Sequence, residues 1–343
     1  MRLAHVRERH APAGSAWRLA AALDGDGTAW LDLEVARRRA IAANRTLEHD
    51  LALFRRPVTT LDDHLAAGLR VATLGDLVDG FRARGEDDDA VLQADGLRFG
   101  PPVLRPPSFR DFYAFEQHAR TTWGRRGQEI PEPWYRLPVF YFSNVSELRG
   151  PDDPVWAPRG SLELDYEAEV GLLIDTPAID LPEERGEEAI GGLLVLNDWS
   201  ARDLQRDETP VRLGPAKGKD FALSIGPWLV TPDELADRRA SGSTAPDLAI
   251  SAMVRSADGT ATETTRGSLA TIPYPLGSLV ARASADVHLR PGELLGTGTV
   301  GGGCLLEIGE ERLGRWLEPG DEVTLEVERL GRLVTPIVAR PGA

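Results

Sequence analysis

The sequence is poor in cysteine, lysine and long apolar runs. Cys304 is the only cysteine among 343 residues, so an intramolecular disulfide is impossible and a zinc site held by thiolates is excluded. No stretch approaches the roughly 20 apolar residues of a membrane span. The opening residues, Met1 to Arg7, lack the apolar run of a signal peptide. We therefore expect a cytoplasmic protein that does not bind membranes.

A basic face is also missing. The formal net charge is −15, which argues against a nucleic-acid-binding protein. The charge does not exclude an acidic substrate, because a local cationic pocket can exist on an acidic protein. Hydrophobic residues make up 42% of the chain, as in ordinary globular proteins, and the length is sufficient for two or three domains.

Only two of the 39 cationic residues are lysines, and both lie in the segment Pro215 to Asp220. An ammonium is compact and rotates its donors freely, whereas a guanidinium is a planar fork. A lysine that persists against such a strong arginine bias indicates a role that arginine cannot fill. We interpret Lys217 as a solvated loop residue. Lys219 stands between a glycine and an aromatic-apolar run, and we predict that it is a site residue.

The pattern of expected secondary structure changes near residue 105. Residues 1–33 contain short strand patterns, and residues 34–88 have a more helical pattern. A proline-rich segment, residues 100–107, then interrupts regular structure. We predict a small N-terminal domain at 1–105 and a larger catalytic domain at 106–343.

The second part reads mainly as short strands separated by glycine and proline, with a helix at 109–121 and another after Asp198. Expected strands cover 139–142, 168–174, 190–196, 225–230, 249–254, 294–296, 304–308 and 322–328. The pattern predicts a β-rich α+β fold with a sandwich or rolled barrel as its core.

Acidic residues precede the apolar run 170–174. On a strand, Asp165, Glu167 and Glu169 would share one face. Burial of unpaired carboxylates is expensive, so Glu167 and Glu169 predict a metal site, whereas we interpret Asp165 as a solvated strand end. Asp198 closes another apolar strand and completes a set of three carboxylates. Oxygen ligands favour Mg²⁺, Ca²⁺ or Mn²⁺ over zinc.

Three further segments bear on the site or its local structure. If Ser108 caps a helix over 109–121, Asp111, Phe115 and His118 share one face of it, which is compatible with a satisfied polar pair or with a site wall. Ser200 and Asp203 have the spacing of a capping box and predict a helical turn. The segment 296–301 matches the dinucleotide pattern G-x-G-x-x-G, but an expected strand follows it rather than a helix. We interpret that segment as a loop that allows close backbone approach.

Taken together, these segments resemble the fumarylacetoacetate hydrolase family. The resemblance spans about residues 108–330 and rests on motifs in one order: Asp111-Phe112-Tyr113, Gln117-His118, Leu137-Pro138-Val139 with Tyr141, Glu167-Ala168-Glu169, Asn197-Asp198-Trp199-Ser200-Ala201-Arg202-Asp203-Leu204-Gln205, Gly218-Lys219, and Gly298-Thr299 running to Glu307.

The resemblance implies a mixed β-roll catalytic domain, a homodimer, and hydrolysis of a carbon–carbon bond in a ketonic substrate such as fumarylacetoacetate or an acylpyruvate, as in aromatic catabolism. It implies Mg²⁺ (or Ca²⁺ or Mn²⁺) held by Asp111, Glu167, Glu169 and Asp198. His118 would be the general base and Glu307 its orienting partner. The side chains around the reacting oxygens would be Lys219, Gln205 and Arg202. The residues in contact with the substrate would be Tyr113, Tyr141 and Thr299.

Two positions depart from the fumarylacetoacetate branch. Thr209 stands where a tyrosine is expected, and Gly127, preceded by Arg125 and Arg126, stands where an arginine is expected. These positions would grip the distal carboxylate, so the acyl group of the substrate stays open. The alternative function is metal-dependent decarboxylation or isomerisation of a related 2-oxo acid. A third possibility is a non-catalytic protein that binds a keto acid or a metal.

Overall fold

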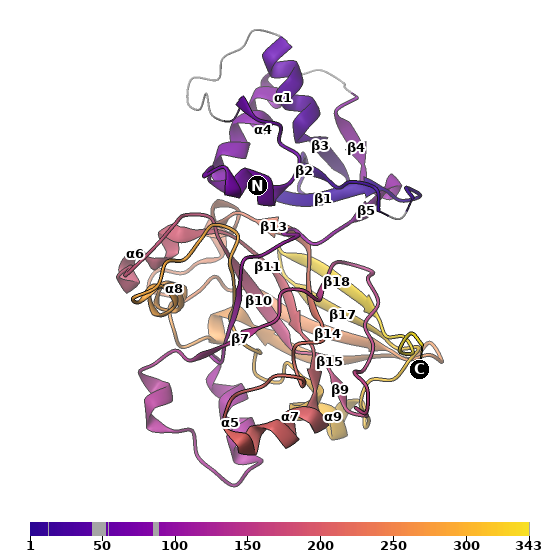
Figure 1. Cartoon of the computed structure of the whole chain (residues 1–343), viewed down its shortest axis with the longest axis vertical. Coiled ribbons are helices and arrows are strands. Elements are labelled where there is room, and N and C mark those ends of the chain that lie inside the picture. The colour runs from indigo at the N-terminus through magenta and orange to yellow at the C-terminus, as the bar shows by residue number, and fades with distance from the viewer. Residues whose placement is uncertain (13, 43–52, 54, 85–88, 343) are drawn as a thin grey trace.

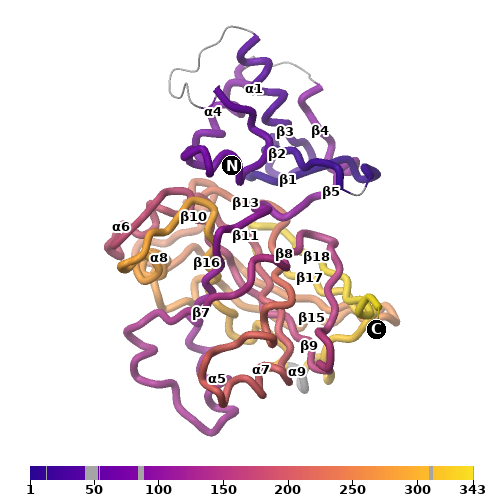
Figure 2. The backbone as a smooth tube through the Cα atoms, in the orientation of Figure 1, coloured from indigo at the N-terminus to yellow at the C-terminus, as the bar shows by residue number. Residues whose placement is uncertain are grey.

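A computed structural model describes residues 1–12, 14–42, 53, 55–84 and 89–342. The molecule has a small upper lobe and a larger lower lobe (Figure 1). The chain leaves the upper lobe after strand β5 (Leu97–Phe99) and builds the lower lobe from the rest of its length (Figure 2). None of the helices in the described ranges combines the length and apolar character that crossing a bilayer requires.

The upper lobe consists of a small sheet covered by helices. Its other strands are β1 (Arg2–Glu8), β2 (Arg18–Ala22), β3 (Ala29–Asp32) and β4 (Val91–Gln93), and its helices are α1 (Leu33–Ala42), α3 (Leu61–Ala66) and α4 (Gly75–Arg84). Asp24 closes the β2–β3 turn by accepting hydrogen bonds from the backbone N–H groups of Thr28 and Ala29. The expected strands and helices of this region are confirmed within its described residues. Residues 43–52, 54 and 85–88 of the helical prediction lie outside them.

The strands of the lower lobe belong mainly to two sheets. The elements in chain order are β6 (Phe109–Phe112), α5 (Glu116–Gly124), β7 (Phe140–Ser143), β8 (Leu148–Arg149), β9 (Leu164–Asp165), β10 (Ala168–Ile174), α6 (Glu183–Gly186), β11 (Ile190–Asp198), β12 (Ser200–Ala201), α7 (Arg202–Glu208), β13 (Leu223–Val230), β14 (Ala249–Arg255), β15 (Ala261–Ser268), α8 (Leu276–Ser284), β16 (Leu294–Gly296), α9 (Leu305–Arg312), β17 (Glu322–Val327) and β18 (Gly331–Pro336). Short 3₁₀ turns cover Val71–Leu74, Ala94–Gly96, Glu132–Tyr135, Glu187–Ala189, Thr209–Val211, Pro232–Arg238 and Leu269–Thr271.

One long mixed sheet runs through both lobes in the order β4-β3-β2-β1-β13-β11-β10-β16-β6-β7. The lobes join where β1 pairs with β13 through Arg2 and Leu3. The β16–β6 pair is parallel, whereas β10 pairs antiparallel with both β11 and β16. Because strand pairing crosses from one lobe to the other, the domain division at residue 105 stays a prediction.

The second sheet, β15-β14-β17-β18, packs against one face of the long sheet. Val170 and Val195 of the long sheet share a buried apolar cluster with Ile250 and Val323 of the second sheet. The opposite face, with Leu173, packs against apolar residues of the upper lobe and its helices. Burial on both faces explains the uninterrupted apolar runs 170–174 of β10 and 190–196 of β11. The predicted β-rich α+β fold is confirmed.

Three local predictions are wrong. Residues 305–312 form helix α9 and not a strand at 304–308. Residues 109–112 form strand β6, so Ser108 caps no helix and α5 begins only at Glu116. Ser200 lies in β12, and α7 begins at Arg202 without a side-chain cap, so the predicted capping box is absent.

Candidate active site

A cavity of about 860 Å³ opens in the lower lobe. Its walls come from β6, α5, β7, β10, α7, the segment after α7 and the glycine-rich loop that follows β16. The predicted site residues that line it are Asp111, Tyr113, His118, Tyr141, Glu167, Glu169, Arg202, Gln205, Lys219 and Thr299. Segments more than 180 residues apart in the sequence therefore meet around one space.

Three carboxylates gather at the base of this cavity. Asp111, Glu167 and Glu169 each offer an oxygen, and these oxygens lie within 4.8 Å of one another. All three residues are buried, and Oδ1 of Asp111 has no hydrogen-bond partner. Burial and repulsion from neighbouring carboxylates raise the pKa of both Asp111 and Glu169 well above the usual range. These acidic residues could hold a divalent cation, which would supply the missing positive charge.

Lys219 lies between Glu167, a member of the acid cluster, and Asp198. Its Nζ is 2.5 Å from Oε2 of Glu167 and 2.8 Å from Oδ2 of Asp198. Burial lowers the pKa of Lys219, but the charges of Asp198 and Glu167 more than offset that effect and raise the pKa above its ordinary value. The ammonium is therefore buried and charged. Lys217, by contrast, is exposed and pairs with Asp220 at the surface.

Asp198 lies beside the acid cluster but does not belong to it. Its Oδ2 accepts hydrogen bonds from Tyr141, at 2.5 Å, and from Lys219. Its Oδ1 is buried and has no partner. Burial raises the pKa of Asp198, and Lys219 opposes this shift. One oxygen of Asp198 thus has no protein partner and the other is committed to the protein; its role as a metal ligand stays a prediction.

Arg202 connects three parts of the site. Its guanidinium donates to Oδ2 of Asp165 at 2.8 Å and to Oε1 of Gln205 at 2.9 Å, and it lies 2.8 Å from Oε1 of Glu167. The interpretation of Asp165 as a solvated strand end is wrong, because this side chain is fully buried. The strand breaks after Asp165, between β9 and β10, so the three acids do not share one continuous strand face.

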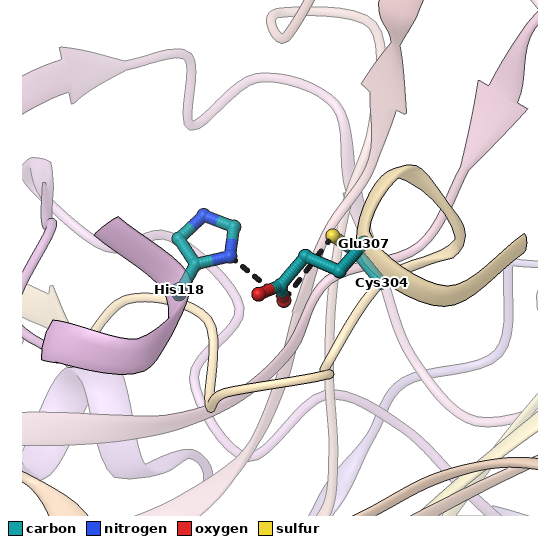
Figure 3. Close-up of side chains that lie close together, drawn as sticks. All are labelled: His118, Cys304 and Glu307. Carbon is teal, nitrogen blue, oxygen red and sulfur yellow. Dashed lines mark hydrogen bonds and ion pairs between the residues drawn. The ribbon is translucent and has the colours of Figure 1, made fainter. Parts of the chain in front are cut away.

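His118 and Glu307 come together from different helices. Nδ1 of His118, on α5, lies 2.9 Å from Oε2 of Glu307, on α9, and their side chains are only 6% and 2% exposed (Figure 3). Figure 3 also places the other ring nitrogen away from the carboxylate. The edge of the Tyr113 ring packs against the imidazole, with centroids 5.2 Å apart. The family resemblance paired His118 with Glu307, and the structure brings the two together. His118 lies on a helix as expected, although that helix begins at Glu116, whereas Glu307 lies on α9 and not on the expected strand.

The glycine-rich loop contributes to the acid cluster. The backbone N–H of Gly298 donates to Oε2 of Glu169 at 3.1 Å, and the Thr299 hydroxyl donates to Oε1 at 3.3 Å. Gly298 has φ +84°, and a Cβ there would lie 2.3 Å from the carbonyl oxygen of Phe112. The loop therefore permits close backbone approach, as expected. A helix does follow it, contrary to our argument against a dinucleotide site, but β16 and β17 lie in different sheets and form no βαβ unit.

Sequence reasoning missed several residues of this region. Asp165 accepts hydrogen bonds from the N–H groups of Leu305 and Leu306, in the first turn of α9. The Cys304 thiol donates to Oε2 of Glu307 at 3.7 Å. Arg212 lines the cavity, as Arg125 and Arg126 do. The one available signal was the position of the single cysteine, three residues before Glu307.

Comparisons with known proteins agree with this arrangement. Residues 108–338 match the family model described as fumarylacetoacetate (FAA) hydrolase, C-terminal. A fumarylacetoacetase of Arabidopsis thaliana is 30% identical, with 63% of each chain covered. The present chain thus spans less than two thirds of that relative.

Two solved structures have the same fold over 99% of the chain. One is a fumarylacetoacetate hydrolase from Exiguobacterium antarcticum, with 100% of that chain covered, 20% identity and a TM-score of 0.66. The other is a probable 2-hydroxyhepta-2,4-diene-1,7-dioate isomerase from Mycobacterium abscessus, with 99% of that chain covered, 20% identity and a TM-score of 0.66.

Proposed function

Because the chain belongs to the fumarylacetoacetate hydrolase family, we propose that it is a metal-dependent hydrolase that cleaves a carbon–carbon bond in a 1,3-diketo acid. The observation that carries this proposal is the 2.9 Å contact between His118 and Glu307 at the wall of a cavity that also contains the acid cluster. A base held by a carboxylate is what water activation requires. A reaction that only moves a proton within the substrate needs no activated water.

The metal site is proposed on the donor set. Asp111, Glu167 and Glu169 would hold the cation, with Asp198 nearby, and their all-oxygen ligands favour Mg²⁺ over zinc. Unpartnered oxygens on Asp111 and Asp198 are consistent with a cation that completes the site. Such an ion would polarise the two substrate oxygens and favour the enolate that leaves when the carbon–carbon bond breaks.

His118 would take a proton from water as the water oxygen attacks the reacting carbonyl carbon. The new carbon–oxygen bond forms a tetrahedral oxyanion, and the carbon–carbon bond then breaks with its electron pair leaving as an enolate. The proton held by His118 can then move to the enolate carbon that lost the bond, so one water is consumed and two acids are released. Glu307 would fix the orientation of the imidazole and stabilise its protonated form. A positioned base of this kind contributes about 10²–10⁴-fold.

Lys219 would stabilise the oxyanion. It is buried, positively charged and directed at the acid cluster, so its ammonium can donate to an oxygen bound next to Glu167. An aimed donor in a water-poor site is worth roughly 3–4 kcal/mol in the transition state. Arg202 and Gln205 would extend this set of donors, because Arg202 already orders the Gln205 side chain.

The cavity rim favours an acidic substrate. Arg125, Arg126 and Arg212 line it, and Arg212 is exposed. Guanidinium groups bind carboxylates in a two-pronged geometry. The Thr209 hydroxyl donates to the carbonyl oxygen of Gln205, so it does not replace the tyrosine that the family resemblance led us to expect. A second carboxylate on the substrate would therefore rely on the arginines.

The test is a panel of acylpyruvates and fumarylacetoacetate with Mg²⁺, with loss of diketone absorbance as the readout. We expect turnover in the native protein and a fall of about 10²–10⁴-fold in His118→Ala. His288→Ala is the matched control, because His288 is exposed, and it should retain the native rate. Undiminished turnover in His118→Ala would reject the base assignment.

The second candidate is decarboxylation or isomerisation of a related 2-oxo acid at the same metal site. It is favoured by the isomerase name of one solved neighbour, which shares the fold. The two reactions differ in products: hydrolysis releases two acids, decarboxylation releases carbon dioxide, and isomerisation keeps the mass of the substrate. Analysis of the products from the same panel separates them.

A further inference from the structure

A second cluster of possible metal ligands lies beside the acid cluster and has different chemistry. His118, Cys304 and Glu307 each offer one donor atom, and the three atoms lie within 4.8 Å of one another (Figure 3). The donors are nitrogen, sulfur and oxygen, whereas the acid cluster offers oxygen alone. We propose that this cluster is an inhibitory site for Zn²⁺ or a similar borderline cation, which would bind Nδ1 of His118, Oε2 of Glu307 and Sγ of Cys304.

The distances suit zinc. Tetrahedral coordination with Zn–N and Zn–O of about 2.0 Å and Zn–S of about 2.3 Å requires the nitrogen and oxygen to be about 3.3 Å apart and the sulfur and oxygen about 3.5 Å apart. The corresponding separations are 2.9 Å for His118 to Glu307 and 3.7 Å for Cys304 to Glu307. The first two pairs therefore need shifts of a few tenths of an ångström. The nitrogen and sulfur, which lie within 4.8 Å of each other, must come to about 3.5 Å, and water would take the fourth position.

The surroundings also suit a bound ion. Cys304 is fully buried, and the His118 and Glu307 side chains are 6% and 2% exposed. Oε1 of Glu307 has no hydrogen-bond partner. His118 and Leu306 line the cavity, so the cluster lies directly behind its wall and an entering ion has a short path.

Zinc must displace a proton to bind. Burial, followed by the negative charge of Asp165, raises the pKa of the Cys304 thiol well above its usual range, so the sulfur carries its proton when no metal is present. A coordinated thiol loses that proton to solvent, and no electron transfer is involved. The single cysteine led us to exclude a zinc site held by thiolates, but one sulfur joined by an imidazole and a carboxylate is a different donor set.

The two clusters would then select different ions. Hard Mg²⁺ prefers the oxygens of Asp111, Glu167 and Glu169, and zinc prefers the mixed donors. Zinc at Nδ1 of His118 would separate the imidazole from Glu307 and fix the ring, so the base could no longer be oriented by the carboxylate. The inhibition rests on the proposed function, but the binding does not.

Binding is tested with Co²⁺, whose bond to a thiolate gives a charge-transfer absorption band. Metal-free protein is first saturated with Mg²⁺ and then titrated with Co²⁺. We expect one equivalent to produce the band, Zn²⁺ to abolish it, and Cys304→Ser to lack it. Glu169→Gln, which alters only the acid cluster, should keep the band. If the native protein gives no band, Cys304 is only a hydrogen-bond donor to Glu307 and the proposal is wrong.

A second experiment measures the affinity for Zn²⁺ by calorimetry, in the presence of Mg²⁺, and compares the native protein with its variants. Loss of a group that hydrogen-bonds to a metal ligand weakens metal binding by about 10–100-fold. Cys304→Ser removes a ligand itself, so it should weaken zinc binding at least that much. If Cys304→Ser fails to fold, His118→Ala is tested instead, because His118 lies on a different helix. This variant must show the same loss of zinc affinity. Equal zinc affinity in the native and variant proteins would overturn the site. If turnover is detected, zinc inhibition, scaled to each variant's own rate, should weaken in parallel with binding.

Discussion

Nζ of Lys219 lies 2.5 Å from Oε2 of Glu167, and the same ammonium contacts Oδ2 of Asp198 at 2.8 Å. Both carboxylates are buried, so this one cation offsets negative charge at two places at once, just before β10 and at the end of β11. Burial alone raises the pKa of Glu167, but Lys219 and then Arg202 hold it well below the ordinary value. The ammonium thus divides the acids into two groups: Glu167 and Asp198, which it contacts, and Asp111 and Glu169, which it does not.

Replacement of Lys219 by arginine should reduce activity even though the charge is retained. A planar guanidinium cannot occupy the small space between two oxygens that the ammonium contacts at 2.5 and 2.8 Å. We expect kcat to fall by about 10²–10³-fold, the usual loss when one oxyanion donor is removed. Lys217→Arg is the control, because Lys217 is 71% exposed. Similar kinetics for the two variants would contradict the role of Lys219.

Replacement of Gly298 by alanine should damage both stability and the acid cluster. The left-handed backbone alone costs alanine about 1–2 kcal/mol. Gly160→Ala measures the backbone cost alone, because Gly160 has φ +85° and no atom within 4 Å of the position that a Cβ would take. In Gly298→Ala, by contrast, the Cβ would meet the Phe112 carbonyl oxygen at 2.3 Å. Chemical unfolding should therefore show a larger loss for Gly298→Ala, and Mg²⁺ affinity should fall only in that variant. Equal losses would show that the close contact is relieved without consequence.

Metal removal should destabilise the protein most at higher pH. Burial and neighbouring carboxylates raise the pKa of Asp111 and Glu169. The folded state therefore binds more protons than the unfolded state between the unfolded pKa, about 4, and the raised folded values, so the free energy of unfolding decreases as pH rises through that window. A dication replaces those protons. Mg²⁺ at about 100 times its Kd should add about 2.7 kcal/mol.

The corresponding measurement is the thermal unfolding temperature with chelator and with a fixed concentration of Mg²⁺. The gain from Mg²⁺ should be larger at about pH 8 than at about pH 5, because protons compete with the cation at low pH. Glu169→Gln should reduce both the gain and its pH dependence. A gain that is the same at both pH values would indicate that the cation binds elsewhere.

Asp165→Asn should destabilise the fold and disturb the His118–Glu307 pair. Asp165 accepts hydrogen bonds from Arg202 and from two N–H groups of α9, the helix that carries Glu307. Removal of one partner of a buried ion pair costs about 3–5 kcal/mol. We expect a loss of that order in urea unfolding, and no change in Glu184→Gln, an exposed acid. An Asp165→Asn variant as stable as the native protein would show that Arg202 is satisfied by Glu167 alone.

The residues of the site could be predicted from the sequence better than their local structure. Glu167, Glu169 and Asp198 flank the apolar runs 170–174 and 190–196, and that pattern indicates buried acids with a shared counter-charge. Lys219 was identified by the scarcity of lysine, and its burial agrees. The positions of Asp111 and His118 followed from the family motifs, whereas the single helix proposed to carry both was wrong.

The errors have a common physical cause, which is contact between distant segments. Residues 304–308 are a short apolar run that is ambiguous between strand and helix. The helix is selected by Asp165, 140 residues away, which accepts hydrogen bonds from its first turn. In the same way, β6 is a strand because Asp111 pairs with Gly296 on one side and Tyr141 on the other. Neither partner is visible in the local pattern.

The most direct test of the account uses water labelled with heavy oxygen. The native protein, loaded with Mg²⁺, converts an acylpyruvate in this water, and the products are identified by mass spectrometry. Attack by water activated at His118 predicts one heavy oxygen in the newly formed carboxylate and no release of carbon dioxide. Product formation with carbon dioxide release, or with the label absent from the new carboxylate, would contradict carbon–carbon bond hydrolysis.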